Sequence, residues 1–300
     1  MNSECPLNPA VALPTATATG GSTTAGFILV ITQSETPLAK RAHLQKVNRE
    51  RQFIKAKRAK LTKIMAQQLK ALGKDLAKQV TSKLDKSEAS LIETIISNLG
   101  FTKWQEATAE KVKPYLSAIA VDGGETTLEA MGLFTEEVAA LMRVRALEWA
   151  EYRSAEMVGM KWVNGELVQN PNAFWTITEP TRDALRSTIQ NGLSEGMSMD
   201  ELSKEIEASH AFSPSRAKVI ARTETAKADV AGTMQSYRSV DGVIGKQWLT
   251  ADDEKVSDDC RLNESAGIIP LNATFPAGDD APPNHPNCRC DIAAIFADNE

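Results

Sequence analysis

The chain has 300 residues, of which 42% are hydrophobic and 24% are charged, as in an ordinary globular protein with a real core. The length suggests one or two domains, at roughly 100–200 residues per domain. Four cysteines are far fewer than a secreted disulfide scaffold contains, so that class of protein is excluded.

The net charge of −5 hides a strong asymmetry. Fourteen Lys and Arg residues but only two acids lie between residues 37 and 83, a surplus of +12. The remainder of the chain must then carry −17. Such a surplus exceeds what solubility requires and favours an anionic partner for this segment.

Residues 1–36 are rich in Ala, Thr, Pro, Gly and Ser, and we expect a flexible N-terminal arm with a short strand at 26–32. The longest apolar run there, residues 27–31, is much shorter than the roughly 20 residues that span a bilayer. No cationic segment precedes an apolar core, so a secretory signal is not expected either. These features predict a soluble protein of a reducing cytoplasm without a membrane contact.

Residues 37–84 are predicted to form a basic amphipathic helix that begins at Pro37, after the candidate cap Thr36. An apolar stripe at helical spacing follows the second half of this segment. Its members are Leu61, Ile64, Met65, Leu69, Leu72, Leu76 and Val80.

The basic side chains occupy the other faces of this helix, and we expect some of them to contact DNA phosphates. These candidates are Lys55, Lys57, Arg58, Lys60 and Lys63. Phe53 is the only aromatic residue in the segment, so the segment lacks a surface on which bases could stack. Any DNA contact would therefore be to phosphates, non-specific and salt-sensitive. An acidic protein surface, the chain's own acidic middle and an ordinary solvated helix face are the alternatives.

Residues 85–174 are predicted to be an acidic helical region, with amphipathic pieces at 89–99, 106–119 and 135–158. Asp122-Gly123-Gly124 and Asn164-Gly165 are typical turn sequences and predict breaks between and after these helices.

Residues 175–300 carry sharper helix signals. A helix opened by Pro180 is expected to close at Gly196, and Ser198 with Glu201 forms a capping box for the next helix. A long helix then begins after Ser213-Pro214 and runs to about Tyr237. A stripe of small residues on this helix predicts close approach of another backbone. The stripe contains Ala217, Ala221, Thr225, Ala228 and Gly232.

The same helix contains Ala221-Arg222-Thr223-Glu224-Thr225. Arg222 and Glu224 are two residues apart and cannot face each other, so each is expected to pair elsewhere. A catalytic glutamate is one interpretation. We favour an ion-pair network that fixes two helices, because no nucleophile or second acid is spaced to cooperate.

The last fifty residues contain short strand-like pieces at 243–250, 268–271 and 291–296, together with Cys260, His285, Cys288 and Cys290. Thiolate and imidazole are preferred ligands of Zn²⁺, and four of them suffice for a closed tetrahedral site. A structural zinc ion, a disulfide of Cys260 and a set of ordinary buried thiols are the three interpretations. The fold class is therefore expected to be mainly α, with long helices followed by a small, zinc-stapled α+β module.

The ordered motifs of residues 175–296 resemble the phage Mu gpF-like head morphogenesis proteins, also called minor head or minor capsid proteins. Within these motifs lie Thr181-Arg182-Asp183-Ala184-Leu185-Arg186, Ile220-Ala221-Arg222-Thr223-Glu224, Trp248 and His285-Pro286-Asn287-Cys288-Arg289-Cys290. The resemblance implies a structural role for Arg222, Thr223, Glu224 and Trp248. Many relatives have a Cys-x-x-Cys pair ahead of the terminal element, but here Ser257 stands in place of its first cysteine. Either His285 completes a three-sulfur site, or Asp258 or Asp259 contributes an oxygen, or the site is degenerate.

The resemblance further implies a non-enzymatic, low-copy protein of the virion head. It would be made in the host cytoplasm and contact portal or capsid proteins at the portal vertex and inner capsid. Packaged double-stranded DNA is the expected partner of the basic helix. The alternative from another class is a zinc-dependent nuclease or other hydrolase, which would need an open coordination position and a nearby base.

Overall fold

The computed structural model of the chain describes residues 52–83, 96, 99–174 and 176–297. The predicted arm at 1–36 and the first part of the predicted basic helix, residues 37–51, lie outside the described residues.

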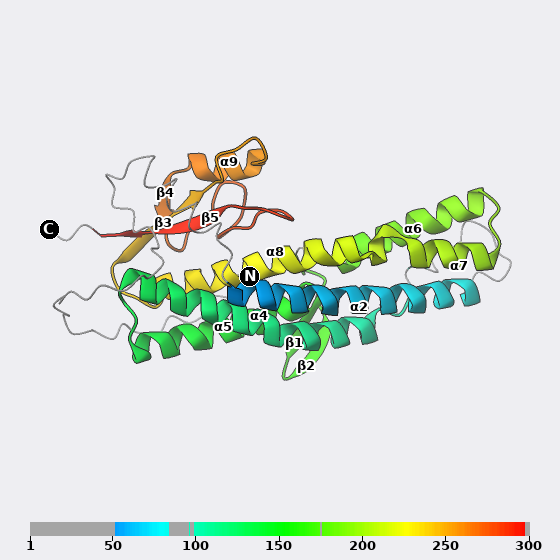
Figure 1. Ribbon diagram of the computed structural model, residues 1–300, viewed down its shortest axis with the longest axis horizontal. Helices are drawn as coiled ribbons and strands as arrows, with labels where there is room; N and C mark the ends of the chain where they lie inside the picture. Colours follow the sequence, from blue (N-terminus) through cyan, green and yellow to red (C-terminus); the bar gives the residue numbers. More distant parts are fainter. Residues whose placement is uncertain (1–51, 84–95, 97–98, 175, 298–300) are drawn as a thin grey trace.

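Helices make up most of the described structure and form an elongated bundle (Figure 1). The α-helices are α2 (Gln52–Lys83), α4 (Thr102–Met131), α5 (Glu136–Glu156), α6 (Thr178–Ser194), α7 (Met199–Ala208), α8 (Pro214–Tyr237) and α9 (Asp258–Ser265), and the 3-10 helix is η2 (His210–Phe212). The prediction of a mainly α fold with a small α+β C-terminal module is confirmed.

The strands form two separate sheets. They are β1 (Met160–Val163), β2 (Glu166–Gln169), β3 (Val243–Leu249), β4 (Ile268–Pro270) and β5 (Asp291–Phe296). The first two make an antiparallel hairpin, and the other three make an antiparallel sheet in the order β4-β3-β5. All three strands predicted near the C-terminus are confirmed, whereas α9 was not anticipated.

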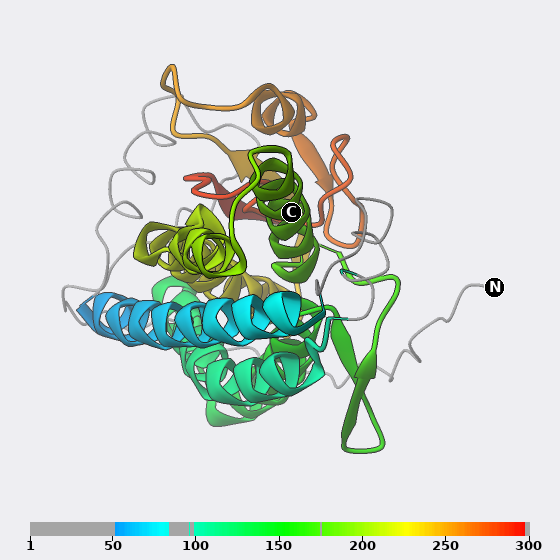
Figure 2. The same cartoon turned by 90° about the vertical axis from the view of Figure 1, so that its right-hand side faces the viewer.

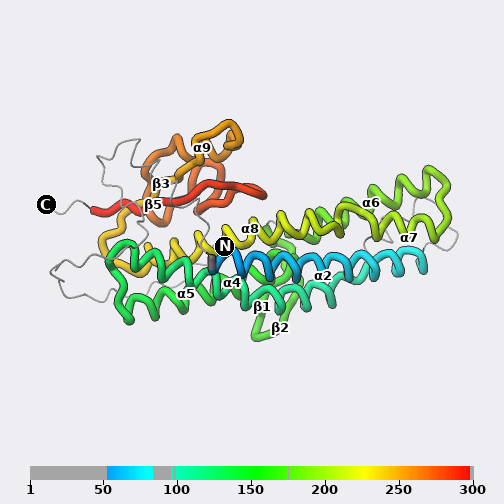
Figure 3. The backbone as a smooth tube through the Cα atoms, viewed as in Figure 1, coloured from blue at the N-terminus to red at the C-terminus, as the bar shows by residue number. Residues whose placement is uncertain are grey.

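Helix α8 is the central element, because both halves of the molecule pack on it. Its N-terminal half packs against α2 and η2, and it also contacts α4 and α5. The last turns of α8 pack against the small sheet. Helices α6 and α7 lie at the opposite end of α8 (Figure 3). The hydroxyl of Tyr237 in the last turn donates to the carbonyl of Ile292 in β5, at 3.2 Å.

The apolar core divides within α8. One cluster joins α2, α4, α5, α6, α7 and the part of α8 up to Ala228. A second cluster begins at Val230 and includes Trp248, Phe275 and the two buried thiols of Cys260 and Cys288. The apolar core therefore divides near residue 229, within α8.

Glycines let the backbones of α4 and α8 approach each other closely. A Cβ atom built on Gly232 would lie 1.9 Å from the carbonyl oxygen of Ala120, and one built on Gly124 would lie 3.0 Å from the carbonyl oxygen of Gly232. The predicted small-residue stripe on α8 is thus the surface on which another backbone packs.

This contact also explains why the turn predicted at Asp122-Gly123-Gly124 is wrong. Both glycines lie inside α4, where a Cβ on Gly123 would meet Asp229 of α8 at 2.6 Å. Helix α4 tolerates the propensity penalty of two glycines because their missing side chains let α8 approach closely.

The region predicted as helical up to residue 174 instead contains the β1–β2 hairpin near its end, and this hairpin projects from the helical bundle (Figure 2). Asn164 and Gly165 form its turn with φ values of 51° and 82°. A two-residue turn with two positive φ angles matches the twist of a hairpin. The turn predicted at Asn164-Gly165 is therefore confirmed.

The local signals for the C-terminal helices are also confirmed. Ser198 and Glu201 make the reciprocal bonds of a capping box, and Ser213 caps α8 by accepting from the amide of Arg216. Within the described residues, none of the helices is long and apolar enough to cross a membrane.

Gly232→Ala should destabilise the protein by roughly 1–3 kcal/mol, because a methyl group on α8 would overlap the backbone of α4. Thermal unfolding should show a melting temperature several degrees lower. Gly100→Ala is the matched control, because its Cβ would meet nothing closer than 3.6 Å. Equal melting temperatures for the two variants would contradict the close contact.

Candidate metal centre and family motif

Three of the four predicted metal ligands converge beside the small sheet. The ligand atoms of Cys260, His285 and Cys288 all lie within 4.8 Å of one another. Cys260 comes from the first turn of α9, and His285 and Cys288 come from the loop that leads into β5. Both thiols are buried, and the imidazole is partly exposed.

The distance between the two buried sulfurs suits a tetrahedral metal. The Sγ atoms of Cys260 and Cys288 are 3.6 Å apart. Zinc–sulfur bonds of about 2.3 Å in a tetrahedron place two sulfurs about 3.8 Å apart. A disulfide would need about 2.05 Å, and neither thiol is bonded covalently. This group of residues could therefore hold a metal ion.

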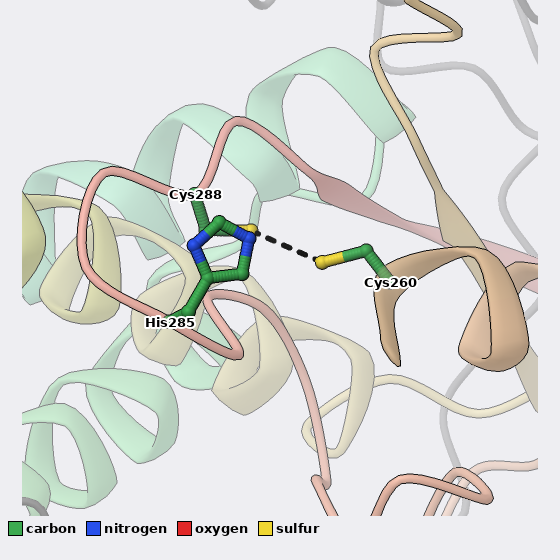
Figure 4. A group of neighbouring side chains, drawn as sticks. All are labelled: Cys260, His285 and Cys288. Carbon is green, nitrogen blue, oxygen red and sulfur yellow. Dashed lines mark hydrogen bonds between the residues drawn. The ribbon is translucent and has the colours of Figure 1, made fainter. Parts of the chain in front are cut away.

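The imidazole of His285 lies next to the sulfur of Cys288, and one ring nitrogen faces the two sulfurs (Figure 4). Its Nδ1 atom lies 3.0 Å from the carbonyl oxygen of Pro286. Metal-ligating histidines commonly hold their second ring nitrogen against a carbonyl in this way, which fixes the ring orientation.

Cys290 adjoins this group without belonging to it. The neighbouring thiols of Cys260 and Cys288 raise the pKa of the Cys290 thiol. The same neighbourhood lowers the pKa of Cys288, while Cys288 raises the pKa of Cys260.

The structure gives Ser257 a role different from metal binding. Its hydroxyl accepts from the backbone amide of Cys260, at 3.3 Å, and so caps the N-terminus of α9. Serine is a favoured residue at this helix position. The other proposed oxygen ligands, Asp258 and Asp259, are exposed in the first turn of α9 and do not join the group.

Two contacts hold the cysteine loop in place. Arg289 donates to both carboxylate oxygens of Asp253, at 2.6 and 2.5 Å. These bonds lower the pKa of Asp253 to about 2. On the other side, the amide of Asn287 donates to the hydroxyl of Thr223 on α8, at 3.3 Å.

Thr223 belongs to the motif that the sequence analysis singled out, and its neighbour Glu224 makes a buried ion pair. Arg153 of α5 donates to both carboxylate oxygens of Glu224, at 2.9 and 2.7 Å. Their side chains are 3% and 5% exposed. Burial alone would raise the pKa of Glu224, but the charge and hydrogen bonds of Arg153 hold it below its usual value. Glu224 is thus a paired carboxylate, as expected for a helix-fixing network.

The guanidinium of Arg153 is also held by other groups. It donates to Glu156 at 2.7 Å and to the carbonyl of Phe174 at 3.2 Å. Nearby, burial and the charge of Arg153 lower the pKa of Lys227 to about 8. Arg153 lies in the middle region and had no motif around it, so sequence reasoning missed it.

The remaining motif residues occupy contrasting positions. Trp248 is fully buried and packs edge-on against Phe275, with ring centroids 5.2 Å apart. Arg222 is exposed on α8.

The basic candidates on α2 do not all share one surface. Lys55, Lys60 and Lys63 are exposed, whereas Arg58 is partly buried, and burial lowers its pKa. Lys57 lies over the rings of Phe53 and Tyr115.

Sequence reasoning missed three further exposed lysines that complete a straight basic stripe along α2. The basic stripe consists of Lys60, Lys63, Lys70, Lys74 and Lys78. Their spacing of three, seven, four and four residues places them on one helix face. The spacing of the apolar residues could have revealed this face, because the basic stripe lies on the opposite side of α2 from the apolar stripe that contains Leu61 and Leu69.

Residues 183–293 match the profile of a family described as Phage Mu protein F like protein. This part of the chain is similar to that family. The match runs from α6 to β5, so the predicted resemblance is confirmed for the part of the chain that holds the motif and the cysteines. The family suggests a phage head morphogenesis protein and a structural role. Searches of curated proteins and of solved structures found no significant match.

Proposed function

We propose that this chain is a phage minor head protein that acts in head assembly at the portal vertex or the inner capsid surface. The observation that carries the proposal is the Phage Mu protein F-like match over residues 183–293. The geometry supports a structural role, because the family motif is used to join α8, α5 and the cysteine loop. Portal and capsid proteins are the partners this function requires.

A zinc ion would have a structural part in this proposal. Cys260, His285 and Cys288 provide three donors, and Cys290 is the nearest thiol to complete a closed site. The ion would join α9 to the loop before β5. Because the ligands must be deprotonated, binding would release protons from the thiols, and binding energy would become folding energy of the module.

The zinc-dependent nuclease or hydrolase considered from the sequence gains no support from this geometry. Among the described residues, no carboxylate joins the converging group. The one buried carboxylate of the motif, Glu224, is fully engaged by Arg153. A general base must reach the proton that it abstracts, and none of the carboxylates that the structure describes lies within the Cys260–His285–Cys288 group.

The basic stripe of α2 is the surface we propose for DNA contact. It extends over about 27 Å, at 1.5 Å per residue, and its only acidic neighbour on the described helix is Asp75. Lysines without interleaved aromatic rings suit phosphate contact rather than base recognition.

The assembly role can be tested in phage particles. The chain should be found by mass spectrometry at low copy number in purified heads, and it should be lost from heads assembled without the portal protein. Retention in portal-free heads would favour an inner capsid position. Absence from normal heads would contradict the proposal.

Freshly reduced protein should contain about one zinc ion per chain, measured by atomic emission, and Cys288→Ser should lose it. Removing the ion should unfold the sheet module first. Cys5→Ser is the matched control, because it removes the one cysteine that is not among the proposed ligands. A metal-free wild-type protein would contradict the zinc site.

Changing Lys63, Lys70 and Lys74 to Gln should weaken binding to duplex DNA. The slope of log K against log salt should fall by about 2.7, because each lysine that no longer neutralises a phosphate lowers the slope by about 0.9. The control changes Lys103, Lys111 and Lys161 to Gln, which removes the same charge from other exposed positions. Equally weakened binding in both variants would indicate attraction by net charge alone and would contradict a dedicated stripe.

A further inference from the structure

The indole nitrogen of Trp248 is a buried donor that lacks an acceptor. The side chain is 0% exposed and belongs to the apolar cluster that also contains Cys260 and Cys288. Its Nε1 atom has no hydrogen-bond partner among the described residues. An indole N–H can only donate, and leaving such a donor unsatisfied in the interior costs free energy. The position of this donor therefore calls for a functional reason.

The register of the small sheet brings this donor close to Cys290. Trp248 of β3 pairs with Ile292 of β5, and the next pair is Leu249 with Asp291. Cys290 directly precedes β5, and side chains alternate along an extended chain, so Cys290 shares a face with Ile292 and Trp248. Diagonal neighbours on one face are about 7–8 Å apart at Cα, which an aromatic side chain can bridge. Cys290 packs against the same apolar cluster as Trp248.

The electrostatic effect of the indole on Cys290 agrees with this placement. The thiols of Cys260 and Cys288 raise the pKa of Cys290, whereas the indole of Trp248 acts in the opposite direction and lowers it. A donor that favours the thiolate has this effect, and the thiolate is the form that binds a metal.

We propose that Trp248 is a positioning residue of the candidate metal centre. Its indole N–H donates to the sulfur of Cys290 and holds that thiolate as the fourth ligand, beside Cys260, His285 and Cys288. This inference rests on the zinc site proposed above and deepens it, because it assigns the fourth donor and the group that orients it.

The proposed arrangement gives the site a second oriented ligand. The carbonyl oxygen of Pro286 lies 3.0 Å from Nδ1 of His285, so one ligand is already held by a group outside the metal-binding set. Groups of this kind fix the direction of a ligand, and their loss typically weakens metal binding by about 10- to 100-fold. Trp248 would act in the same way on Cys290.

Cobalt binding to the freshly reduced full chain tests this role, because absorption from sulfur-to-cobalt charge transfer reports the number of thiolate ligands. The wild type should bind Co²⁺ through three thiolates. Trp248→Phe keeps an aromatic ring but removes the N–H, and its affinity for Co²⁺ should fall by about 10- to 100-fold. At saturating cobalt its charge-transfer absorption should fall by about one third, since one of three sulfurs leaves the metal.

A double-mutant cycle separates positioning from packing. Cys290→Ser should weaken cobalt binding in the wild type but should have little further effect in Trp248→Phe, because both changes remove the same ligand. Phe275→Leu is the matched control, since it removes the ring that packs on Trp248 and keeps the indole N–H. Its effect should add to that of Cys290→Ser.

A second measurement needs no variant. In the wild-type chain loaded with cadmium-113, the indole hydrogen of Trp248 should show scalar coupling to the metal through the sulfur of Cys290.

The outcomes that overturn the proposal can be told apart from failure of the zinc site. Additive effects of Trp248→Phe and Cys290→Ser would show that Trp248 only packs. A cadmium-loaded chain whose indole hydrogen shows no coupling would also overturn the role of Trp248, and both results would leave the metal site in place. A wild-type chain without sulfur-to-cobalt absorption would overturn the zinc site itself and this role with it.

Discussion

The buried ion pair between Arg153 and Glu224 is the interaction on which the rest of the structure depends. It fixes α8 against α5. The adjacent residue, Thr223, holds the cysteine loop by accepting a hydrogen bond from the amide of Asn287. Isolated buried charges are very unfavourable, so each partner is needed to keep the other in place. One short stretch of α8 thus contacts both the helical bundle and the candidate metal centre. Two neighbouring residues of the motif, Thr223 and Glu224, therefore join α8 to the cysteine loop and to α5.

Features with a local cause could be predicted from the sequence. The capping box at Ser198 and Glu201, the start of α8 after Ser213 and the three C-terminal strands all follow from residues within a few positions of one another. The small-residue stripe also indicated the close packing on α8, although it did not reveal which helix packs there. The converging Cys260, His285 and Cys288 were predictable from ligand chemistry alone.

Features that depend on distant partners were not predictable. Gly123 and Gly124 have a turn sequence, but they lie inside a helix. Their missing side chains let the backbone of α8 approach at Asp229 and Gly232, more than one hundred residues later. Arg153 pairs with Glu224 across 71 residues, and nothing near Arg153 marks it. Ser257 stands where the sequence resemblance led us to expect a thiol, and its role as a helix cap could be recognised only from the position of α9.

A double-mutant cycle tests the junction most directly. Arg153→Met and Glu224→Met should each lower the free energy of unfolding by about 3–5 kcal/mol, because each leaves a buried charge without its partner. The double variant should recover much of this stability, with a coupling energy of at least about 2 kcal/mol. Additive effects, with a coupling energy near zero, would contradict the account.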